Sequence, residues 1–497
     1  MGTARHRLLL ALGACAALVA VGAISSAVPA SEAQGQRPNV IVIMTDDQRL
    51  DDLQVMRATR RELVRGGVSF RKFYTTLPWC CPSRVTFLTG QYAHNHGIYS
   101  GRPPDGGYSA FKPDQNATMP VALHDAGYRT ALLGKYLNGY PRSAEGPPGD
   151  IPPGWDNWQA LIGWKMFDFP LNFQGEEVRI QGRSKYLTDV LARRAAAEIR
   201  SAAASPDPLF MSVMTLAPHR EPGLKGTNAA HNPRPARRHR GRFGRRSLPS
   251  SPAMNEFDMS DKPPFLAGLA RRSDWWMRRQ QLLHQDRLAS LLAVDDLVER
   301  VMDELRATGQ LDDTYVLFTS DNGFLLGEHR LTGKNKLYEE GARVPMMIRG
   351  PGLPAGQRVK EITGNIDLAP TIYDIADVGT PPIEPDGVSL LEVAGDTDAF
   401  AQREIVLEKQ GAEGLRTPDW TYIEHDRDDV PGPDQFELYD MRTDPWQLMN
   451  LYAKTLGPAD PDHDPARYDP VLEAERIALA ARLDELRECA GDECREP

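Results

Sequence analysis

Five short apolar runs limit most strongly what this 497-residue chain can fold into. The first, Asn39–Met44, has no polar residue after Asn39, which is typical of a strand buried on both faces in a parallel sheet. Helical patterns lie between the runs, the clearest over Leu291–Leu305. The alternation predicts an α/β fold with a large, mostly parallel sheet flanked by helices. The other four runs are Thr130–Leu133, Leu209–Met214, Thr314–Phe318 and Val344–Ile348.

Polar residues follow four of these five runs, whereas the run that ends at Arg349 leads into ordinary turn residues, Gly350-Pro351-Gly352. Ligands of parallel α/β sheets bind beyond the carboxyl ends of the strands. We therefore expect the polar residues at the four strand ends to form one site. They are Asp46, Asp47, Lys135, His219, Asp321 and Asn322.

Asp46, Asp47, Asp321 and Asn322 offer hard oxygen ligands after two different strands. Three carboxylates and an amide suit calcium better than zinc. Taken alone, Asp46-Asp47 is more typical of a solvated turn, because adjacent carboxylates repel each other. The second acidic pair after another buried strand favours a metal site.

Cys80-Cys81-Pro82-Ser83-Arg84 predicts a nucleophile beside an anion site. Proline is tolerated in the first turn of a helix, so Ser83–Leu88 is predicted to be a short helix that Gly90 ends. Cys80 then lies just before a helix N-terminus, where free N–H groups favour an anion, and Arg84 adds a planar donor fork. The alternative is that Cys80 and Cys81 are two ordinary buried thiols.

The spacing Cys80-x-Pro82-Ser83-Arg84, followed by Leu88-Thr89-Gly90, resembles the signature of the type I sulfatases of the alkaline phosphatase superfamily. The resemblance implies an alkaline phosphatase-like fold. It also implies that a formylglycine-generating enzyme converts Cys80 to Cα-formylglycine (3-oxoalanine), with Cys81 at a variable position. One calcium ion would then be held by residue 80 together with Asp46, Asp47, Asp321 and Asn322.

Gly134-Lys135-Tyr136-Leu137-Asn138 and His94-Asn95-His96 are most similar to the N-acetylglucosamine-6-sulfatase branch, which implies a sulfated glycan substrate. Many sulfatases carry a histidine where this chain has Leu137. We therefore expect His94 or His96 to support the formylglycine hydroxyls instead.

Lys135, Lys334 and Arg84 are expected to neutralise a sulfate ester, and His219 to donate a proton to the leaving alcohol. Lys336 is a near rival of Lys334. Two alternatives stay open: a phosphonate monoester hydrolase or phosphodiesterase of the same superfamily, and a non-catalytic relative that binds anionic glycans. The binding alternative rests on the arginine-rich stretch His231–Arg246, which is otherwise a solvated loop.

The N-terminal residues 1–33 read as a secretory signal, because two arginines precede an alanine-rich apolar run and a small-residue stretch. A lipoprotein anchor at Cys15 ranks lower, because apolar sequence continues past it. No second run is long enough to span a bilayer. We expect a secreted, periplasmic or cell-surface protein without an integral membrane segment. The net charge of −10 argues against nucleic acid as a partner.

The chain is expected to divide into a catalytic domain over 37–385 and a smaller antiparallel α+β subdomain over 386–497. Short strands are predicted near Ile405–Leu407, Trp420–Glu424 and Phe436–Tyr439, and a helix over Val471–Cys489. Cys489 and Cys494 are expected to form a disulfide, as oxidising compartments allow.

Overall fold

The computed structural model describes residues 37–141, 149–182, 184–221, 232–425, 435–458, 460, 462 and 464–495. The predicted secretory signal and His231, the first residue of the arginine-rich stretch, lie outside the described residues. Within the described part, no helix is both long and apolar enough to cross a membrane.

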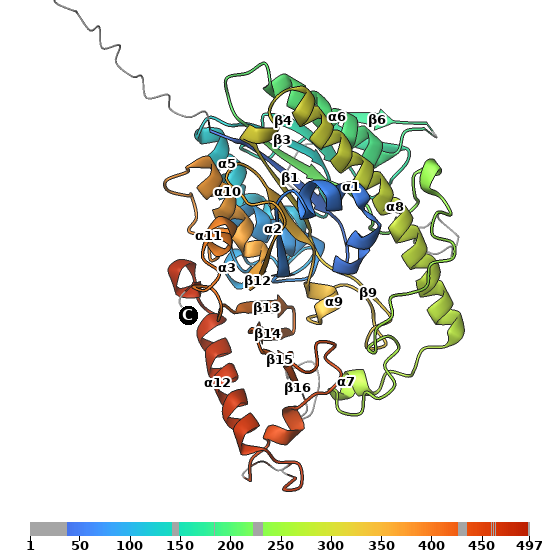
Figure 1. Ribbon diagram of the computed structural model, residues 1–497, viewed down its shortest axis with the longest axis vertical. Coiled ribbons are helices and arrows are strands. Elements are labelled where there is room, and N and C mark those ends of the chain that lie inside the picture. The colour runs from blue at the N-terminus through green and yellow to red at the C-terminus, as the bar shows by residue number, and fades with distance from the viewer. Residues whose placement is uncertain are drawn as a thin grey trace, which may run out of the picture. The chain divides into compact units, whose positions relative to one another are not determined.

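A ten-stranded sheet forms the centre of the structure, in the order β12-β2-β11-β8-β1-β7-β3-β4-β5-β6 (Figure 1). Strand β1 (Asn39–Thr45) pairs in parallel with β7 (Leu209–Met214) and β8 (Thr314–Ser320). The strands β7, β3 and β4 continue the parallel arrangement. The predicted α/β fold with a mostly parallel sheet is confirmed. The remaining strands are β2 (Val68–Tyr74), β3 (Arg129–Gly134), β4 (Asn157–Leu161), β5 (Phe169–Phe173), β6 (Glu176–Ile180), β11 (Met346–Arg349) and β12 (Gln357–Gly364).

Strand β11, predicted over Val344–Ile348, runs antiparallel to its neighbours β8 and β2. Its carboxyl end at Arg349 therefore lies at the opposite edge of the sheet from the ends of β1 and β8. This direction explains why the run leads into turn residues rather than site residues.

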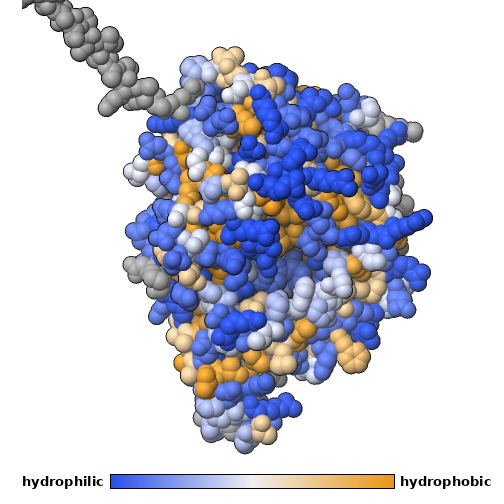
Figure 2. Space-filling model, in the orientation of Figure 1, coloured by the Kyte–Doolittle hydropathy of each residue, from blue (hydrophilic) through white to orange (hydrophobic). Residues whose placement is uncertain are grey.

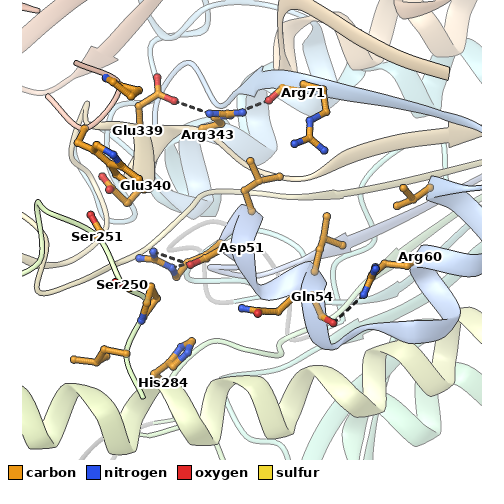
Figure 3. Close-up of a pocket in the computed structure, with 18 of the residues that line it drawn as sticks. Asp51, Gln54, Arg60, Arg71, Ser250, Ser251, His284, Glu339, Glu340 and Arg343 are labelled. Atoms are coloured by element: carbon orange, nitrogen blue, oxygen red, sulfur yellow. Dashed lines mark hydrogen bonds and ion pairs between the residues drawn. The ribbon is translucent and has the colours of Figure 1, made fainter. Parts of the chain in front are cut away.

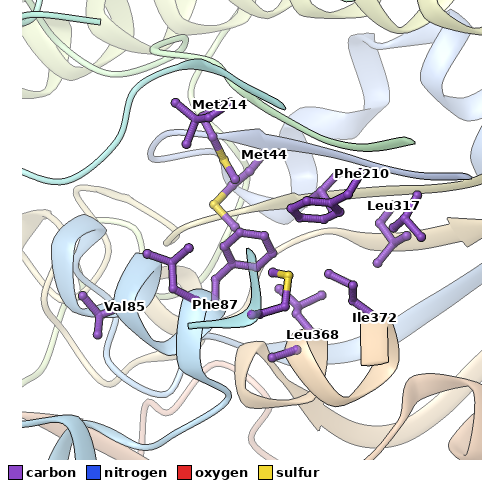
Figure 4. Close-up of a cluster of buried hydrophobic side chains, with 14 of the residues drawn as sticks. Met44, Val85, Phe87, Phe210, Met214, Leu317, Leu368 and Ile372 are labelled. Atoms are coloured by element: carbon purple, nitrogen blue, oxygen red, sulfur yellow. The ribbon is translucent and has the colours of Figure 1, made fainter. Parts of the chain in front are cut away.

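Alternate side chains of β1 enter two different cores, as a strand covered on both faces requires. Val40, Val42 and Met44 pack on the side of α2 (Cys80–Thr89), α5 (Met119–Asp125) and α10 (Leu368–Ala376), and Figure 4 shows Met44 against Phe87, Phe210 and Met214. Ile41 and Ile43 pack on the side of α6 (Leu187–Ala202) and α8 (Asp274–Ala307). Burial of this kind contributes about 1.5–3 kcal/mol per large aliphatic side chain.

Shorter elements connect these layers and carry several residues of interest. They are η1 (Leu50–Val55), α1 (Arg57–Thr59), η2 (Arg60–Val64), α3 (Ala93–His96), α4 (Gly107–Phe111), η3 (Lys112–Ala117), η4 (Arg237–His239), α7 (Pro264–Ala267), η5 (Leu311–Asp313), β9 (Leu325–Leu326), β10 (Thr332–Gly333), α9 (Glu339–Ala342), η6 (Asn365–Asp367) and α11 (Leu390–Gly395).

The C-terminal part forms a separate antiparallel sheet of four strands, β13-β14-β15-β16. Leu479, Leu483 and Leu486 of α12 (Pro470–Leu486) pack against it. A disulfide joins Cys489 and Cys494, whose Cα atoms are 5.1 Å apart. The strands are β13 (Ile405–Lys409), β14 (Ala412–Arg416), β15 (Trp420–His425) and β16 (Phe436–Asp440), followed by η7 (Tyr452–Thr455) and, after α12, η8 (Gly491–Cys494).

Candidate active site

The parallel register of β1 and β8 brings the two acidic pairs together, because Thr45 lies beside Ser320. Asp46, Asp47, Asp321 and Asn322 are all buried, the most exposed being Asp47 at 2%. The Asp47 N–H donates to Asp321 Oδ1 at 3.1 Å, and the Asn322 amide donates to Asp47 Oδ1 at 2.8 Å. We call these four residues the carboxylate cluster.

Asp47 has a left-handed backbone conformation, with φ of 71°. Non-glycine residues adopt this conformation at a cost, and such strain gathers at functional sites. At this position it lets two consecutive side chains face the same group, since Lys334 Nζ lies 3.9 Å from Asp46 Oδ1 and 2.5 Å from Asp47 Oδ1.

Each carboxylate of the cluster has its own cation. Lys135 Nζ lies 2.6 Å from Asp46 Oδ2, Lys334 pairs with Asp47, and Arg84 Nε donates to Asp321 Oδ2 at 2.8 Å. Burial would raise the pKa of Asp47, but Lys334 and other nearby cations outweigh it and hold that pKa below its usual range. Burial and the neighbouring Asp46 instead raise the pKa of Asp321.

Two oxygens of the cluster, Asp46 Oδ1 and Asn322 Oδ1, are buried without a hydrogen-bond partner in the described part of the chain. A buried polar atom left in this way costs about 1–3 kcal/mol. A bound cation would satisfy both, and oxygen ligands of this kind suit calcium. Asp46, Asp47 and His219 also offer ligand atoms that lie within 4.8 Å of one another. The residues present therefore fit a metal ion.

Helix α2 begins at Cys80 itself, three residues earlier than the predicted start at Ser83. The helix continues through Pro82 because a residue of the first turn needs no N–H partner. Gly90, with φ of 79°, ends it as expected. Cys80 is only 1% exposed, and its Sγ donates to Asn138 Oδ1 at 3.4 Å. Its neighbour Cys81 lies in the hydrophobic core, where burial raises the pKa of the thiol to about 12.

Arg84 lies one turn after Cys80 and is 3% exposed. Besides Asp321 it bonds to the Lys135 carbonyl oxygen through Nη1 at 3.0 Å. Its Nη2 has no hydrogen-bond partner in the described residues. One donor of the guanidinium fork therefore remains available for an oxyanion.

His219 meets the cluster from the segment after β7, with Nε2 3.8 Å from Asp47 Oδ2. Its Nδ1 donates to the Arg220 carbonyl oxygen at 2.6 Å, and its ring stacks on Trp164 at 5.0 Å. Lys135 Nζ lies 4.4 Å from the centroid of the same indole. Burial, with help from the lysines, lowers the pKa of His219 to about 3 although Asp47 opposes this. The imidazole is therefore neutral, with the lone pair on Nε2.

His94 and His96 have other partners. His94 bonds to Glu408 Oε1 at 2.9 Å and to the Cys489 carbonyl oxygen at 3.0 Å. Its pKa is raised, because the bond to Glu408 outweighs the effect of burial. His96 bonds to Thr86 Oγ1 through Nε2 at 3.1 Å and accepts from the Ile98 N–H through Nδ1. Both ring nitrogens of each histidine are thus engaged, so neither ring has one left to support Cys80.

Sequence reasoning did not single out three residues of the site: Asn138, Trp164 and Arg287. Asn138 is the last residue of the Gly134–Asn138 motif, so the motif could have identified it as a hydrogen-bond partner of Cys80. Trp164 follows β4 in a segment without a periodic pattern. Arg287 of α8 is fully buried and donates to the Asp47 carbonyl oxygen, but the sequence around it is that of an ordinary helix. Of the two candidate lysines, Lys334 is the one that forms an ion pair with Asp47. Burial lowers the pKa of Lys336.

Comparison with known proteins agrees with this geometry. Residues 38–378 match the Sulfatase family, and residues 327–457 match a family described as N-sulphoglucosamine sulphohydrolase, C-terminal. The N-acetylglucosamine-6-sulfatase of Homo sapiens is 30% identical over 544 residues, which cover 99% of this chain and 90% of that protein. The extracellular sulfatase SULF-1 homolog of Drosophila melanogaster is 36% identical over 369 residues, and the match covers 73% of this chain.

This chain spans only 32% of the length of that Drosophila relative. A solved structure of a protein in complex with its substrate, D-glucosamine-2-N,6-O-disulfate, superposes with a TM-score of 0.71 at 24% identity, covering 92% of this chain and 98% of the other. That likeness shows the fold. The family match covers well over half of the chain, and on that ground this chain belongs to the sulfatase family.

Proposed function

We propose that this protein is a sulfuric ester hydrolase that removes sulfate from a sulfated carbohydrate of the N-acetylglucosamine-6-sulfate type. One observation carries the proposal: Cys80 begins helix α2 next to the buried carboxylate cluster and its cations. Asp321 and Asp46 outweigh burial and raise the pKa of Arg84, Asp47 does the same for Lys334, and Cys80 lies near enough to both to add to these effects. The names of the relatives support the choice of substrate.

Residue 80 is proposed to act as Cα-formylglycine, whose hydrate supplies one hydroxyl to attack sulfur and a second that permits release of sulfate. Asp46, Asp47, Asp321 and Asn322, with residue 80, would hold a calcium ion, which supplies Lewis-acid polarisation. The unpartnered oxygens of Asp46 and Asn322 support this assignment.

The chain's own cations bind the ester. Three cations, Lys135, Lys334 and Arg84, pair with the three carboxylates of the cluster, so these charges balance before any ion binds. A divalent cation then leaves an excess of positive charge that only an anionic ligand offsets. Arg84 Nη2 and the two ammonium groups are the donors for the sulfate oxygens, in a site where water is largely excluded.

His219 donates a proton to the leaving alcohol. Its neutral ring presents the Nε2 lone pair, because Nδ1 is fixed on the Arg220 carbonyl oxygen. The negative charge of a bound ester raises the pKa of a neighbouring imidazole. His219 therefore takes up a proton when substrate binds and delivers it from Nε2 as the C–O oxygen departs.

The wider setting of the protein stays a proposal. We propose export by the segment 1–33, to a secreted, periplasmic or cell-surface location, and maturation by a formylglycine-generating enzyme. We likewise keep the division into 37–385 and 386–497. The overlap of the two family matches, residues 327–378, lies just before this proposed boundary.

Peptide mass spectrometry across Cys80, on protein from the native host, tests the mechanism. We expect the mass of formylglycine at position 80 and an unmodified Cys81. Turnover of N-acetylglucosamine 6-sulfate and p-nitrophenyl sulfate should vanish in Cys80→Ala. Cys81→Ala is the matched control, which keeps activity if it folds. A thiol at position 80 in active protein would overturn the mechanism, and faster turnover of a phosphonate monoester than of any sulfate would overturn the function.

A further inference from the structure

Three cavities adjoin one another on the face of the protein that carries η1, α1 and η2. The largest, of about 1080 Å³, is shown in Figure 3, and its neighbours measure about 510 and 250 Å³. Gln54 lines the first two, Arg57 the second and third, and Arg60 the first and third. None of the candidate catalytic or metal-binding residues lines them. We call these three neighbouring cavities together the hollow, which is distinct from the active site.

Exposed arginines line this hollow. We define the arginine band as six of them, contributed by α1, η2, β2 and the end of the arginine-rich stretch. In the part of the chain that the structure describes, the structure shows no ion pair between any of the six and a carboxylate. Within the described residues, the guanidinium groups of Arg60 and Arg246 donate to the backbone and side-chain oxygens of Gln54, respectively. The six residues are Arg57, Arg60, Arg71, Arg242, Arg245 and Arg246.

Other arginines of the same stretch are bound within the protein. Arg234 pairs with Glu221, and Arg238 pairs with Asp189 and Asp296. The stretch therefore divides into residues that attach it to α6 and α8 and residues beside the hollow that make no ion pair with the described part of the chain. Figure 2 shows strongly hydrophilic side chains gathered around α1 on this face.

The carboxylates that line the hollow do not neutralise the band, because most have other partners. Asp51 pairs with Arg49 at 2.8 Å, and Glu339 pairs with Arg343 at 3.1 Å. Asp295 accepts the N–H groups of Ala58 and Thr59. Among the described residues that line the largest cavity, Glu340 is the only carboxylate without a cation at ion-pair distance. An uncompensated positive strip therefore stands on a protein whose net charge is −10.

We propose that the arginine band binds a sulfated polysaccharide chain, apart from the sugar that reacts. Arginine presents a planar fork that matches sulfate and carboxylate oxygens, and the band spreads such forks along several adjoining cavities. Ser247, Ser250 and Ser251 add hydroxyl partners for sugar hydroxyl groups. An extended polyanion with regularly spaced charges suits this layout better than one small ligand. The choice of a sulfated sugar rests on the proposed function.

The hollow begins next to the catalytic segment. Arg49, which lines the largest cavity, follows Asp47 by two residues, and its guanidinium donates to the carbonyl oxygen of Phe324, two residues after Asn322. A polymer held by the band is therefore kept close to the carboxylate cluster. This arrangement favours long chains over single sugars through local concentration.

The test uses full-length mature protein and heparin as the probe. Arg60→Gln, Arg245→Gln and Arg246→Gln are combined in one band variant. The matched control changes three exposed arginines elsewhere, Arg278→Gln, Arg358→Gln and Arg467→Gln, for the same loss of charge. We expect the band variant to bind a heparin oligosaccharide about tenfold more weakly at 0.15 M salt, and the control less than about twofold more weakly. Turnover of N-acetylglucosamine 6-sulfate should be unchanged in both variants.

Binding is also measured in Cys80→Ala, which separates the two proposals. Band-dependent heparin binding by wild-type protein that hydrolyses no sulfate ester would support the band and reject the proposed function. Equal heparin affinity in the band variant and the control would overturn the band. Binding of duplex DNA as tight as that of heparin would overturn the assignment to a sulfated chain. Thermal melting of both variants checks that the loss of binding is not a loss of folding.

Discussion

The carboxylate cluster and the arginine band lie in neighbouring parts of the structure, but they differ in the burial and pairing of their charges. In the cluster, every carboxylate has its own cation and all four residues are buried. In the band, the arginines are exposed and, among the described residues, unpaired with carboxylates. Buried charges interact strongly and resist screening, whereas exposed charges act weakly one by one and fade with salt. Under the two proposals, the cluster holds one ester in one geometry, and the band retains a long chain in many geometries.

The largest effect should come from the cluster. Asp46→Asn removes a charge from a position with an unpartnered buried oxygen. We expect sulfate-ester turnover to fall by at least about 10³-fold, together with loss of tightly bound calcium measured by elemental analysis. Asp51→Asn is the matched control, because Asp51 is partly exposed and pairs with Arg49. Its turnover should stay within about threefold of the wild type. Normal calcium content in Asp46→Asn would contradict the assigned ligand.

A smaller but still large effect is expected from Arg84→Lys. The substitution keeps the charge but loses the fork that reaches Asp321, the Lys135 carbonyl oxygen and the free Nη2 position. We expect kcat/KM for p-nitrophenyl sulfate to fall about 10²-fold. Arg71→Lys in the band, where only exposed charge matters, should leave kcat/KM unchanged. Similar losses in both variants would remove the distinction between the two regions.

Salt should separate the two regions without any mutation. At 0.1 M salt the screening length is about 10 Å, and it shrinks to about 3 Å at 1 M. Between 0.05 and 0.5 M NaCl, affinity for heparin should fall more than about tenfold, while kcat/KM for a small sulfate ester changes less than about threefold. Parallel loss of both quantities would place the band inside the active site.

The smallest effect concerns His284, which lies between the regions. Its ring lines the largest cavity, is 1% exposed, and has Nδ1 3.9 Å from Asp52 Oδ1, a carboxylate paired with Arg287. Burial, followed by Arg49, lowers the pKa of His284 to about 3. The unfolded chain therefore binds a proton below pH 6.5 that the native state does not, so stability present above that pH is lost as pH falls toward 3.

His284→Gln removes this pH-dependent contribution to the free energy of unfolding. Between pH 7 and pH 5, the free energy of unfolding of the wild type should fall by up to about 2 kcal/mol more than that of the variant. Denaturant titrations at the two pH values measure the difference. His124→Gln serves as the control, because His124 is half exposed. Equal pH dependence in wild type and His284→Gln would show that the buried ring takes up a proton in the native state.

Much of the fold could be predicted because the central strands are covered on both faces. Val40 and Val42 face one core while Ile41 and Ile43 face the other, so the run is apolar throughout. Strand direction has no such signature, which is why the reversal of β11 was missed. The edge strand Glu176–Ile180 is largely exposed and has no apolar pattern to find.

The candidate site divides in the same way. Asp46, Asp47, Asp321 and Asn322 could be predicted together because parallel strands end at one edge. His94 and His96 could not be excluded, because their partners Glu408, Cys489 and Thr86 are fixed by tertiary contacts. Trp164 was not predicted because the buried strand β4 that precedes it was not predicted, and Arg287 was not predicted because it lies within a helix.

The position of Cys80 also has a consequence in time. The thiol is 1% exposed, within a helix whose every residue is buried, and hydrogen-bonded to Asn138. A large catalyst cannot reach a side chain enclosed in this way without first unpacking α2. The modification that we propose for residue 80 must therefore take place before folding is complete. On this proposal, a chain that folds before Cys80 is converted would have the native fold but would lack the formylglycine nucleophile.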